Sequence, residues 1–204
     1  MIKAIVFDMG GVLIDLDPKG CIRAFKEILG FDRITELLDP FHQKGIYGEM
    51  EGGLLTTDEF RAAVLAESRP GSRPEDVDRC MDAMISGMEP YKADVLRELS
   101  QKYPLYLLSN NNEIAYARFH RILEGLGLDW RTLFREEFCS YQMKMLKPEP
   151  AFFREAVRRI GLPPEEILFV DDSPVNVDAA RSVGISAVLA PQGADLRQLL
   201  LPLL

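Results

Sequence analysis

The fold of this chain is decided by the stretch AIVFDMGGV at residues 4–12. Four apolar residues run directly into the carboxylate of Asp8, and two glycines follow close behind it. A short apolar run of this kind is typical of a strand that is buried on both faces of a parallel sheet. We therefore expect Asp8 at the rim where open α/β sheets bind ligands, with the glycines allowing backbone groups to approach a ligand closely.

Apolar runs predict three further strands, at residues 105–108, 167–170 and 185–189, besides the first strand at residues 2–8. Amphipathic patterns predict helices at about residues 92–102, 113–124, 149–160, 174–183 and 193–201. Gly161 and Gly184 stand just past two of these helices, where C-terminal caps are expected. The alternation of strands and helices predicts an α/β fold, in which a mostly parallel sheet is covered by helices on both faces.

Residues 16–88 interrupt this alternation, because the patterns in them are helical throughout. Asp17 and Pro18 match an N-cap followed by proline at the first helical position. Thr56 and Glu59 match a capping box that opens another helix. The sequence thus predicts two units, a core of residues 1–15 and 89–204 and an all-helical module of residues 16–88 inserted after the first strand.

The last helix of this module is expected to begin at Pro74 and to carry one apolar side. That side consists of Val77, Met81, Met84, Ile85 and Met88. Methionine and aliphatic residues at helical spacing are typical of packing against a core rather than of contact with a cofactor. The apolar side is therefore interpreted as structural.

Composition narrows the class of protein. The 204 residues are 47% hydrophobic, which is ample for a core, and no apolar stretch approaches the ~20 residues that a membrane span requires. The net charge of −8 disfavours a nucleic-acid partner. The N-terminus enters a strand almost at once, which leaves no room for a signal peptide, so we expect a cytoplasmic protein.

Cysteines and histidines offer no further site. Cys21, Cys80 and Cys139 are odd in number and widely spaced, which argues against a disulfide framework or a zinc site. His42 and His120 are lone histidines, and we expect each on the surface or on a helix face rather than in catalysis.

Polar side chains stand at the ends of three predicted strands. They are Asp8 after the first strand, Ser109 and Asn110 after the second, and Asp171 and Asp172 after the third, and Lys147 precedes a predicted helix. Because the carboxyl ends of parallel strands meet at one edge of a sheet, these groups are expected to converge. Crowded carboxylates need a cation, and Mg²⁺ prefers such oxygen ligands. A hydroxyl, backbone amides and a lysine are groups that bind phosphate oxygens.

On these residues the chain resembles the haloacid dehalogenase superfamily, in its phosphatase-like branch with a helical cap inserted after the first strand. The matching segments, in the family's order and over nearly the full length, are FDMGGV at residues 7–12, LSN at 108–110, LKP at 146–148 and FVDD at 169–172. The resemblance implies a Rossmann-like three-layer core with a cap. It also implies a Mg²⁺-dependent phosphatase that acts on a small phosphorylated metabolite, such as a sugar phosphate, through an aspartyl-phosphate intermediate.

The resemblance implies a set of metal ligands. Asp8 would be one ligand, and the backbone carbonyl of Gly10 would be a second. Asp172 would be a further ligand. Asp171 beside it would be either a direct ligand or a supporting hydrogen-bond acceptor.

The same resemblance implies the groups that handle the phosphate. Asp8 would attack the phosphorus as the nucleophile. Ser109 would donate a hydrogen bond to a phosphate oxygen, helped by the amide of Asn110. Lys147 would bridge Asp8 and the phosphate, offsetting negative charge in the transition state.

Gly10 departs from the family pattern. Most phosphatases of this superfamily carry a second aspartate at this position, which protonates the leaving group and later activates water. Loss of a general acid–base typically costs ~10²–10⁴-fold in rate. The backbone ligand is retained at Gly10, so we expect metal binding and phosphoryl transfer to persist.

A glycine-rich segment at residues 45–53 is expected to lie between helices of the module. Loops at this place in the cap face the site in related proteins. Tyr47, Glu49 and Glu51 are therefore candidates for substrate contact or for replacing the missing acid–base, and the alternative for each is an ordinary loop residue.

The sequence leaves other functions open. A 2-haloacid dehalogenase also uses an aspartate nucleophile and lacks the second aspartate, but it needs no Mg²⁺ and leaves Asp171 and Asp172 unexplained. A phosphoglucomutase-like activity depends on the missing acid–base. A degenerate member would bind a ligand or a partner protein without turnover, and Gly10 is its one support. We expect a small phosphorylated metabolite as partner, neither nucleic acid nor membrane, and a monomer or a homodimer.

Overall fold

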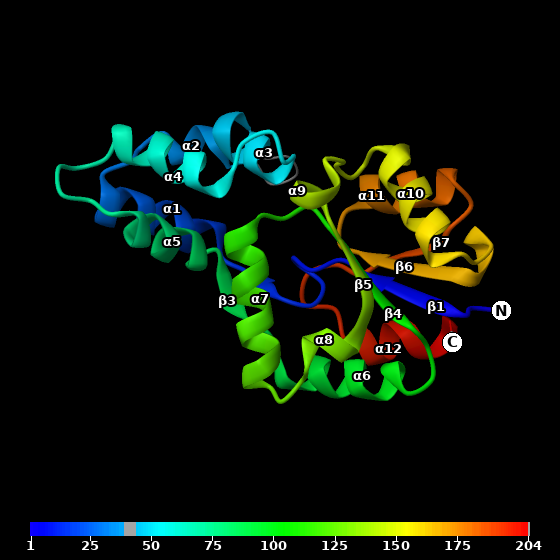
Figure 1. The fold of residues 1–204 in the computed structure, drawn as a ribbon. Helices are drawn as coiled ribbons and strands as arrows, with labels where there is room; N and C mark the ends of the chain where they lie inside the picture. Colours follow the sequence, from blue (N-terminus) through cyan, green and yellow to red (C-terminus); the bar gives the residue numbers. More distant parts are fainter. Residues whose placement is uncertain (39–43, 204) are drawn as a thin grey trace.

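The computed structural model describes residues 1–38 and 44–203, and a five-stranded parallel sheet lies at the centre of the larger unit (Figure 1). The strands are β1 (Ala4–Phe7), β4 (Leu105–Ser109), β5 (Phe134–Cys139), β6 (Ile167–Asp171) and β7 (Ser186–Leu189). Their order in the sheet is β5-β4-β1-β6-β7. The first strand of the chain pairs with β4 on one side and with β6 on the other, so it is central, as its unbroken apolar run predicts.

Helices cover both faces of the sheet, which confirms the predicted α/β fold with three layers (Figure 1). One face carries α10 (Pro150–Ile160) and α11 (Pro174–Ser182), and the other carries α6 (Pro90–Ser100), α7 (Glu113–Gly125), α8 (Trp130–Leu133) and α12 (Leu196–Leu200). Side chains of β1 alternate between two cores, because Ile5 and Phe7 belong to the second face and Ala4 and Val6 to the first.

Strand β5, at the edge of the sheet, was not predicted. Its sequence FREEFC has Arg135, Glu136 and Glu137 in the middle, and these side chains are exposed or half-buried. An edge strand tolerates such charges, and they discourage pairing with another chain. The pattern therefore lacks the apolar run on which the other strands were recognised.

The helices between β1 and α6 lie side by side, away from the two chain ends (Figure 1). They are α1 (Pro18–Ala24), the π-helical η1 (Phe25–Leu29), α2 (Ile34–Leu37), α3 (Gly45–Glu51), α4 (Thr57–Ala66) and α5 (Pro74–Asp82). They bury an apolar cluster to which Phe25 and Phe60 belong, and Ile114 of α7 joins this cluster from the sheet unit. The predicted caps are present: Asp17 accepts a hydrogen bond from the Gly20 amide, and Thr56 and Glu59 form a capping box.

Helix α5 ends earlier than predicted. Its last residue is Asp82, and Ile85–Gly87 form a short strand, β3, that pairs antiparallel with β2 (Asp15–Leu16). Ile85 and Met88 pack against the core of the sheet instead of continuing the apolar side of the helix. An extended chain rises ~3.3 Å per residue against 1.5 Å in a helix, so a ribbon returns the chain to the core in fewer residues. The prediction of an all-helical segment is therefore wrong at this ribbon.

Residues 45–51 form helix α3, where a loop between helices was expected. Tyr47 and Met50 lie on one face of this helix and are buried. The ring of Tyr47 meets the ring of Phe60 edge-on at 5.9 Å between centroids. Packing against α4 thus outweighs the low helix propensity of the glycines.

The remaining predictions concern single side chains and a membrane span. Cys21, Cys80 and Cys139 are buried free thiols. His120 lies on the buried face of α7, stacked on the Trp130 ring, whereas His42 lies outside the described residues. Within residues 1–38 and 44–203, no helix combines the length and the apolar character that crossing a bilayer requires.

Candidate active site

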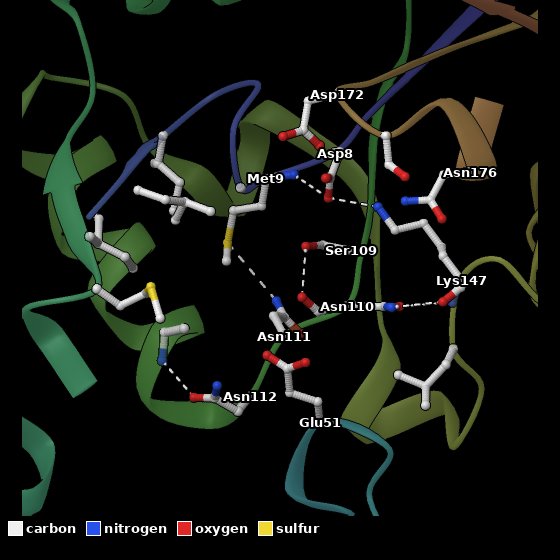
Figure 2. A pocket seen from close by; sticks show the side chains of 18 of the residues that line it. Asp8, Met9, Glu51, Ser109, Asn110, Asn111, Asn112, Lys147, Asp172 and Asn176 are labelled. Atoms are coloured by element: carbon white, nitrogen blue, oxygen red, sulfur yellow. Dashed lines mark hydrogen bonds and ion pairs between the residues drawn. The ribbon is translucent and has the colours of Figure 1, made fainter. Parts of the chain in front are cut away.

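Three neighbouring strands end at a cavity of about 240 Å³ (Figure 2). Asp8 directly follows β1, Ser109 ends β4 and Asp171 ends β6. Helix α3 of the inserted helices lines the cavity with Tyr47, Gly48 and Glu51, and Figure 2 shows Glu51 across from Asp8. Its polar lining consists of Asp8, Tyr47, Glu51, Ser109, Asn110, Asn111, Asn112, Lys147, Asp172, Ser173 and Asn176. Its apolar lining consists of Met9, Ile14, Leu16, Met84, Ile85, Ala115 and Leu146.

Lys147 is the buried cation of the site, with a side chain that is 2% exposed. Its Nζ lies 2.8 Å from Asp8 Oδ1 and 2.7 Å from Asp171 Oδ2. Burial alone would lower the pKa of Lys147, but the charges and hydrogen bonds of Asp171 and Asp8 outweigh it, and the pKa is raised. Lys147 therefore remains charged and links the ends of β1 and β6.

Asp171 and Asp172 are adjacent but have different surroundings. Asp171 is fully buried, and its Oδ1 accepts hydrogen bonds from the Ser173 amide at 2.8 Å and from Asn176 Nδ2 at 3.0 Å. Because Lys147 binds its other oxygen, both oxygens of Asp171 are engaged. Asp172 is half-buried and lines the cavity.

Asp8, Asp171 and Asp172 form a carboxylate cluster, in which one oxygen of each side chain lies within 4.8 Å of the other two. Burial raises the pKa of Asp8 to about 7, against the opposing charge of Lys147. Burial and the neighbouring Asp171 raise the pKa of Asp172. Three carboxylates around one lysine leave an excess of negative charge, and this set of oxygen donors suits Mg²⁺.

The glycines after Asp8 allow close approach for two different reasons. Gly11 has φ of +75°, and a Cβ there would lie 2.0 Å from Asp172 Oδ2, so a side chain at this position would displace the carboxylate. At Gly10, a Cβ would lie 3.1 Å from Leu16 Cδ1. A side chain at position 10 would therefore need Leu16 to give way by a few tenths of an ångström.

Ser109 and Asn110 end β4 in different ways. Ser109 is buried, with its Oγ 3.4 Å from the Asn110 carbonyl oxygen. The side chain of Asn110 makes two hydrogen bonds to the backbone of Lys147. The side chain of Asn110 is engaged with Lys147, so the backbone amide of Asn110 is the group left to contact a substrate.

Ser140 is a buried residue of the site region that no sequence pattern indicated. It begins the short helix α9 (Ser140–Met143), directly after the unpredicted strand β5. Its Oγ accepts a hydrogen bond from the Asn111 amide at 3.0 Å and donates one to the Glu51 carbonyl oxygen at 2.6 Å. Ser140 thus joins the loop after β4 to helix α3.

Asn112 is a lining residue outside the motifs that predict the site, although its place in the sequence carries a recognisable signal. It is the N-cap of α7, where its side chain accepts a hydrogen bond from the Ala115 amide at 3.0 Å. An asparagine just before a helical pattern is typical of such a cap. Asn112 therefore fixes the start of α7 against the cavity that it lines.

The three candidates in the glycine-rich segment, Tyr47, Glu49 and Glu51, lie at two different hollows of the structure. Tyr47 and Glu51 line the cavity. Glu49 is exposed and borders a second hollow, together with Lys144 and Glu149. Burial, and next the charge of Asp8, raise the pKa of Glu51 to about 8.

The chain is similar to known proteins in sequence and in fold. The model of the haloacid dehalogenase-like hydrolases matches residues 2–184. This chain belongs to that family. A D-ribitol-5-phosphate phosphatase from Bacteroides thetaiotaomicron is 32% identical to this hydrolase over 199 residues, covering 97% of this chain and 96% of the relative. The family predicted from the four motifs is thereby confirmed.

Solved structures agree with the fold of this hydrolase. A haloacid dehalogenase family enzyme from Bacteroides thetaiotaomicron, in complex with magnesium and inorganic phosphate, is 35% identical and superposes with a TM-score of 0.90 over 98% of this chain and 99% of that one. A predicted haloacid dehalogenase-like family hydrolase from Porphyromonas gingivalis is 32% identical, with a TM-score of 0.88 over 100% of this chain and 98% of that one. The hydrolase is thus an enzyme of the predicted fold.

Proposed function

We propose that this hydrolase is a Mg²⁺-dependent phosphatase of a small sugar or polyol phosphate, acting through an aspartyl-phosphate intermediate. The observation that carries the proposal is the Asp8 carboxylate, which lies 2.8 Å from Lys147 Nζ and within the carboxylate cluster. The D-ribitol-5-phosphate phosphatase among the relatives supports a polyol phosphate as substrate. A cavity of about 240 Å³ suits a leaving group of a few carbon atoms.

Asp8, the Gly10 carbonyl and Asp172 are the proposed Mg²⁺ ligands. The fit rests on the donor set, which consists of oxygens with an excess of negative charge around one lysine. Asp171 is a supporting residue in this proposal, because both its oxygens already bind Lys147, Ser173 and Asn176. The bound ion would supply positive charge to the phosphate oxygens.

The chain's own residues would carry the reaction. The free oxygen of Asp8 attacks the phosphorus, and the bond between phosphorus and the ester oxygen breaks. Lys147 offsets the charge on the phosphoryl group, and the Ser109 hydroxyl donates a hydrogen bond to one of its oxygens. Water then attacks the phosphorus of the aspartyl phosphate and releases Asp8.

The inserted residues 16–88 are proposed to act as a cap domain on the core of residues 1–15 and 89–204. Support comes from their apolar cluster, which Ile114 of α7 joins from the core, and from the residues of α3 that line the cavity. The ribbon of β2 and β3 is the proposed hinge, since it connects the two apolar clusters through a pair of very short strands. Closure of the cap excludes water from the phosphoryl transfer.

The test is hydrolysis of a panel of sugar and polyol phosphates, with and without Mg²⁺, by the wild type and by Asp8→Asn. Metal-dependent release of phosphate that falls to background in Asp8→Asn is expected. Halide release from a 2-haloacid without metal would establish the dehalogenase alternative, which the absence of an aspartate at position 10 favours. The cytoplasmic location, the lack of nucleic-acid and membrane partners, and a monomeric or homodimeric state stay predictions.

A further inference from the structure

Glu51 carries the one carboxyl group of the described cavity wall that lies outside the cluster of Asp8, Asp171 and Asp172. It is the last residue of α3 and is half-buried. Figure 2 shows its carboxylate pointing into the cavity, toward Asn111 and Ser109. The side chain thus approaches the site from the side opposite the strand ends, where the leaving group of a phosphate ester bound at Asp8 would lie.

The loop after Asp8 offers no acid–base of its own. Gly10 has no side chain, and Leu16 Cδ1 lies close beside it, 3.1 Å from where a Cβ would stand. The neighbouring lining residues Met9 and Ile14 are apolar. A proton for the leaving group must therefore come from another element or from water.

Tyr47, three asparagines and Lys147 also line the cavity, and none of them is suited to both taking up and giving back a proton. Burial raises the pKa of Tyr47 well above its usual value, so its hydroxyl does not ionise near neutral pH. Asn110, Asn111 and Asn112 carry amides, which do not exchange protons with a leaving alcohol. Lys147 is held by two carboxylates, which keep it charged.

The backbone of Glu51 is fixed to the core, so its side chain has a defined place. Ser140 Oγ donates a hydrogen bond to the Glu51 carbonyl oxygen at 2.6 Å. Two residues on, Gly53 has φ of +68°, and a Cβ there would lie 2.2 Å from the Tyr141 carbonyl oxygen. Such an approach is available to glycine alone, and it seats the end of α3 directly on α9.

We infer that Glu51 is the general acid–base of this enzyme, supplied by the inserted helices in place of the aspartate that is absent at position 10. This inference rests on the proposed phosphatase function. When Asp8 attacks, the bond from phosphorus to the ester oxygen breaks, its electron pair goes to that oxygen, and the Glu51 carboxyl group gives it a proton. In the second step the Glu51 carboxylate takes a proton from the attacking water, the bond from phosphorus to Asp8 breaks, and inorganic phosphate leaves.

The surroundings of Glu51 agree with this role. Burial and the charge of Asp8 raise its pKa to about 8, with Lys147 acting in the opposite direction. A carboxyl group with such a pKa is protonated in most molecules at neutral pH, and a general acid works best when its pKa lies near the operating pH.

The experiment compares Glu51→Gln with the wild type on two esters, p-nitrophenyl phosphate and D-ribitol 5-phosphate. Nitrophenolate leaves without a proton, whereas the ribitol alkoxide needs one. We expect kcat for D-ribitol 5-phosphate to fall ~10²–10⁴-fold, the loss typical of a missing general acid–base. With p-nitrophenyl phosphate, the variant should release a first equivalent of nitrophenol at the wild-type rate and then stall as a phosphorylated protein, which mass spectrometry detects at Asp8.

Controls separate this inference from the proposed function. Glu75→Gln removes an exposed carboxylate of α5 that is not among the lining residues of the cavity, and should match the wild type on both esters. If Glu51→Gln slowed the first step equally with the two esters, or changed KM alone, the acid–base role would be overturned. The proposed phosphatase function would not be affected by that result. A wild type that hydrolyses neither ester with Mg²⁺ would overturn the proposed function itself. Thermal unfolding of each variant confirms that it is folded.

Discussion

The side chain of Asn110 binds both the amide and the carbonyl group of Lys147. Asn110 Nδ2 donates a hydrogen bond to the Lys147 carbonyl oxygen at 2.9 Å, and the Lys147 amide donates one to Asn110 Oδ1 at 2.8 Å. The two residues are 37 positions apart in the chain. The pair therefore fixes the distance from the end of β4 to the lysine that bridges the carboxylates.

Removing this clamp should weaken catalysis through Lys147. In Asn110→Ala, two backbone groups of a buried residue lose their partners, at a cost of about 1–3 kcal/mol each. We expect a lower Tm and a kcat that falls ~10-fold or more, because electrostatic catalysis depends on placement. Thermal unfolding and steady-state kinetics measure the two effects. A variant with the stability and kcat of the wild type would show that Lys147 is held by its ion pairs alone.

Lys147 should stabilise the fold as well as the reaction. Lys147→Met leaves Asp8 and Asp171 as buried charges without a cation, and breaking such a pair costs about 3–5 kcal/mol. Because Mg²⁺ offsets the same charge, we expect it to raise the Tm of this variant more than that of the wild type. Lys92→Met is the matched control, since Lys92 is equally buried but pairs with Asp15, outside the cluster. Equal effects of Mg²⁺ on both variants would contradict the proposed metal site.

Gly11 should be required for Mg²⁺ binding. A Cβ in Gly11→Ala would meet Asp172 Oδ2 at 2.0 Å with φ at +75°, so the loop or the carboxylate must move. We expect Mg²⁺ affinity to fall at least ~10-fold, as it does when groups that orient a ligand are lost. Calorimetric titration gives the Kd. Gly125→Ala in α7, where a Cβ meets nothing within 4 Å, should keep the wild-type Kd.

A carboxylate restored at position 10 should replace Glu51. In Gly10→Asp the new Cβ lies 3.1 Å from Leu16 Cδ1, so Leu16 must give way by a few tenths of an ångström, and Leu16→Ala removes this contact. In the Glu51→Gln background, we expect Gly10→Asp together with Leu16→Ala to restore kcat for D-ribitol 5-phosphate. Gly10→Asp without Leu16→Ala should restore less of it. Comparing kcat across the set measures the coupling of the two positions. No gain from the combined variant would show that the site cannot use an acid at position 10.

Stability should depend on pH through Glu51. Its pKa is raised from 4.5 to about 8 in the folded chain, so between these values the folded state binds the proton that the unfolded state has lost. The free energy of unfolding therefore falls as pH rises across this window. Glu51→Gln has no carboxyl group at this position and so does not lose this stability as pH rises. Without metal, the Tm of the variant minus that of the wild type should therefore increase from pH 5 to pH 8. A Tm difference that is constant over this range would contradict the raised pKa.

Much of the fold was readable from local patterns. Apolar runs mark β1, β4 and β6, because strands buried on both faces need no polar alternation. The caps at Asp17 and Thr56 depend on residues three positions away, so the local sequence predicts both of them. Strand β5 was missed because an edge strand can carry charges, and the β2–β3 ribbon because its strands are too short to show a period.

The sequence by itself determined the family and the residues at the ends of the strands, since parallel strands bring their carboxyl ends to one edge whatever lies between them. Only the tertiary structure decided how those residues are supported. It placed Leu16 beside Gly10 and used the Asn110 side chain to hold Lys147. It also joined Ser140 to Glu51 across 89 positions of the chain. Such contacts depend on the meeting of distant segments, for which a local pattern carries no signal.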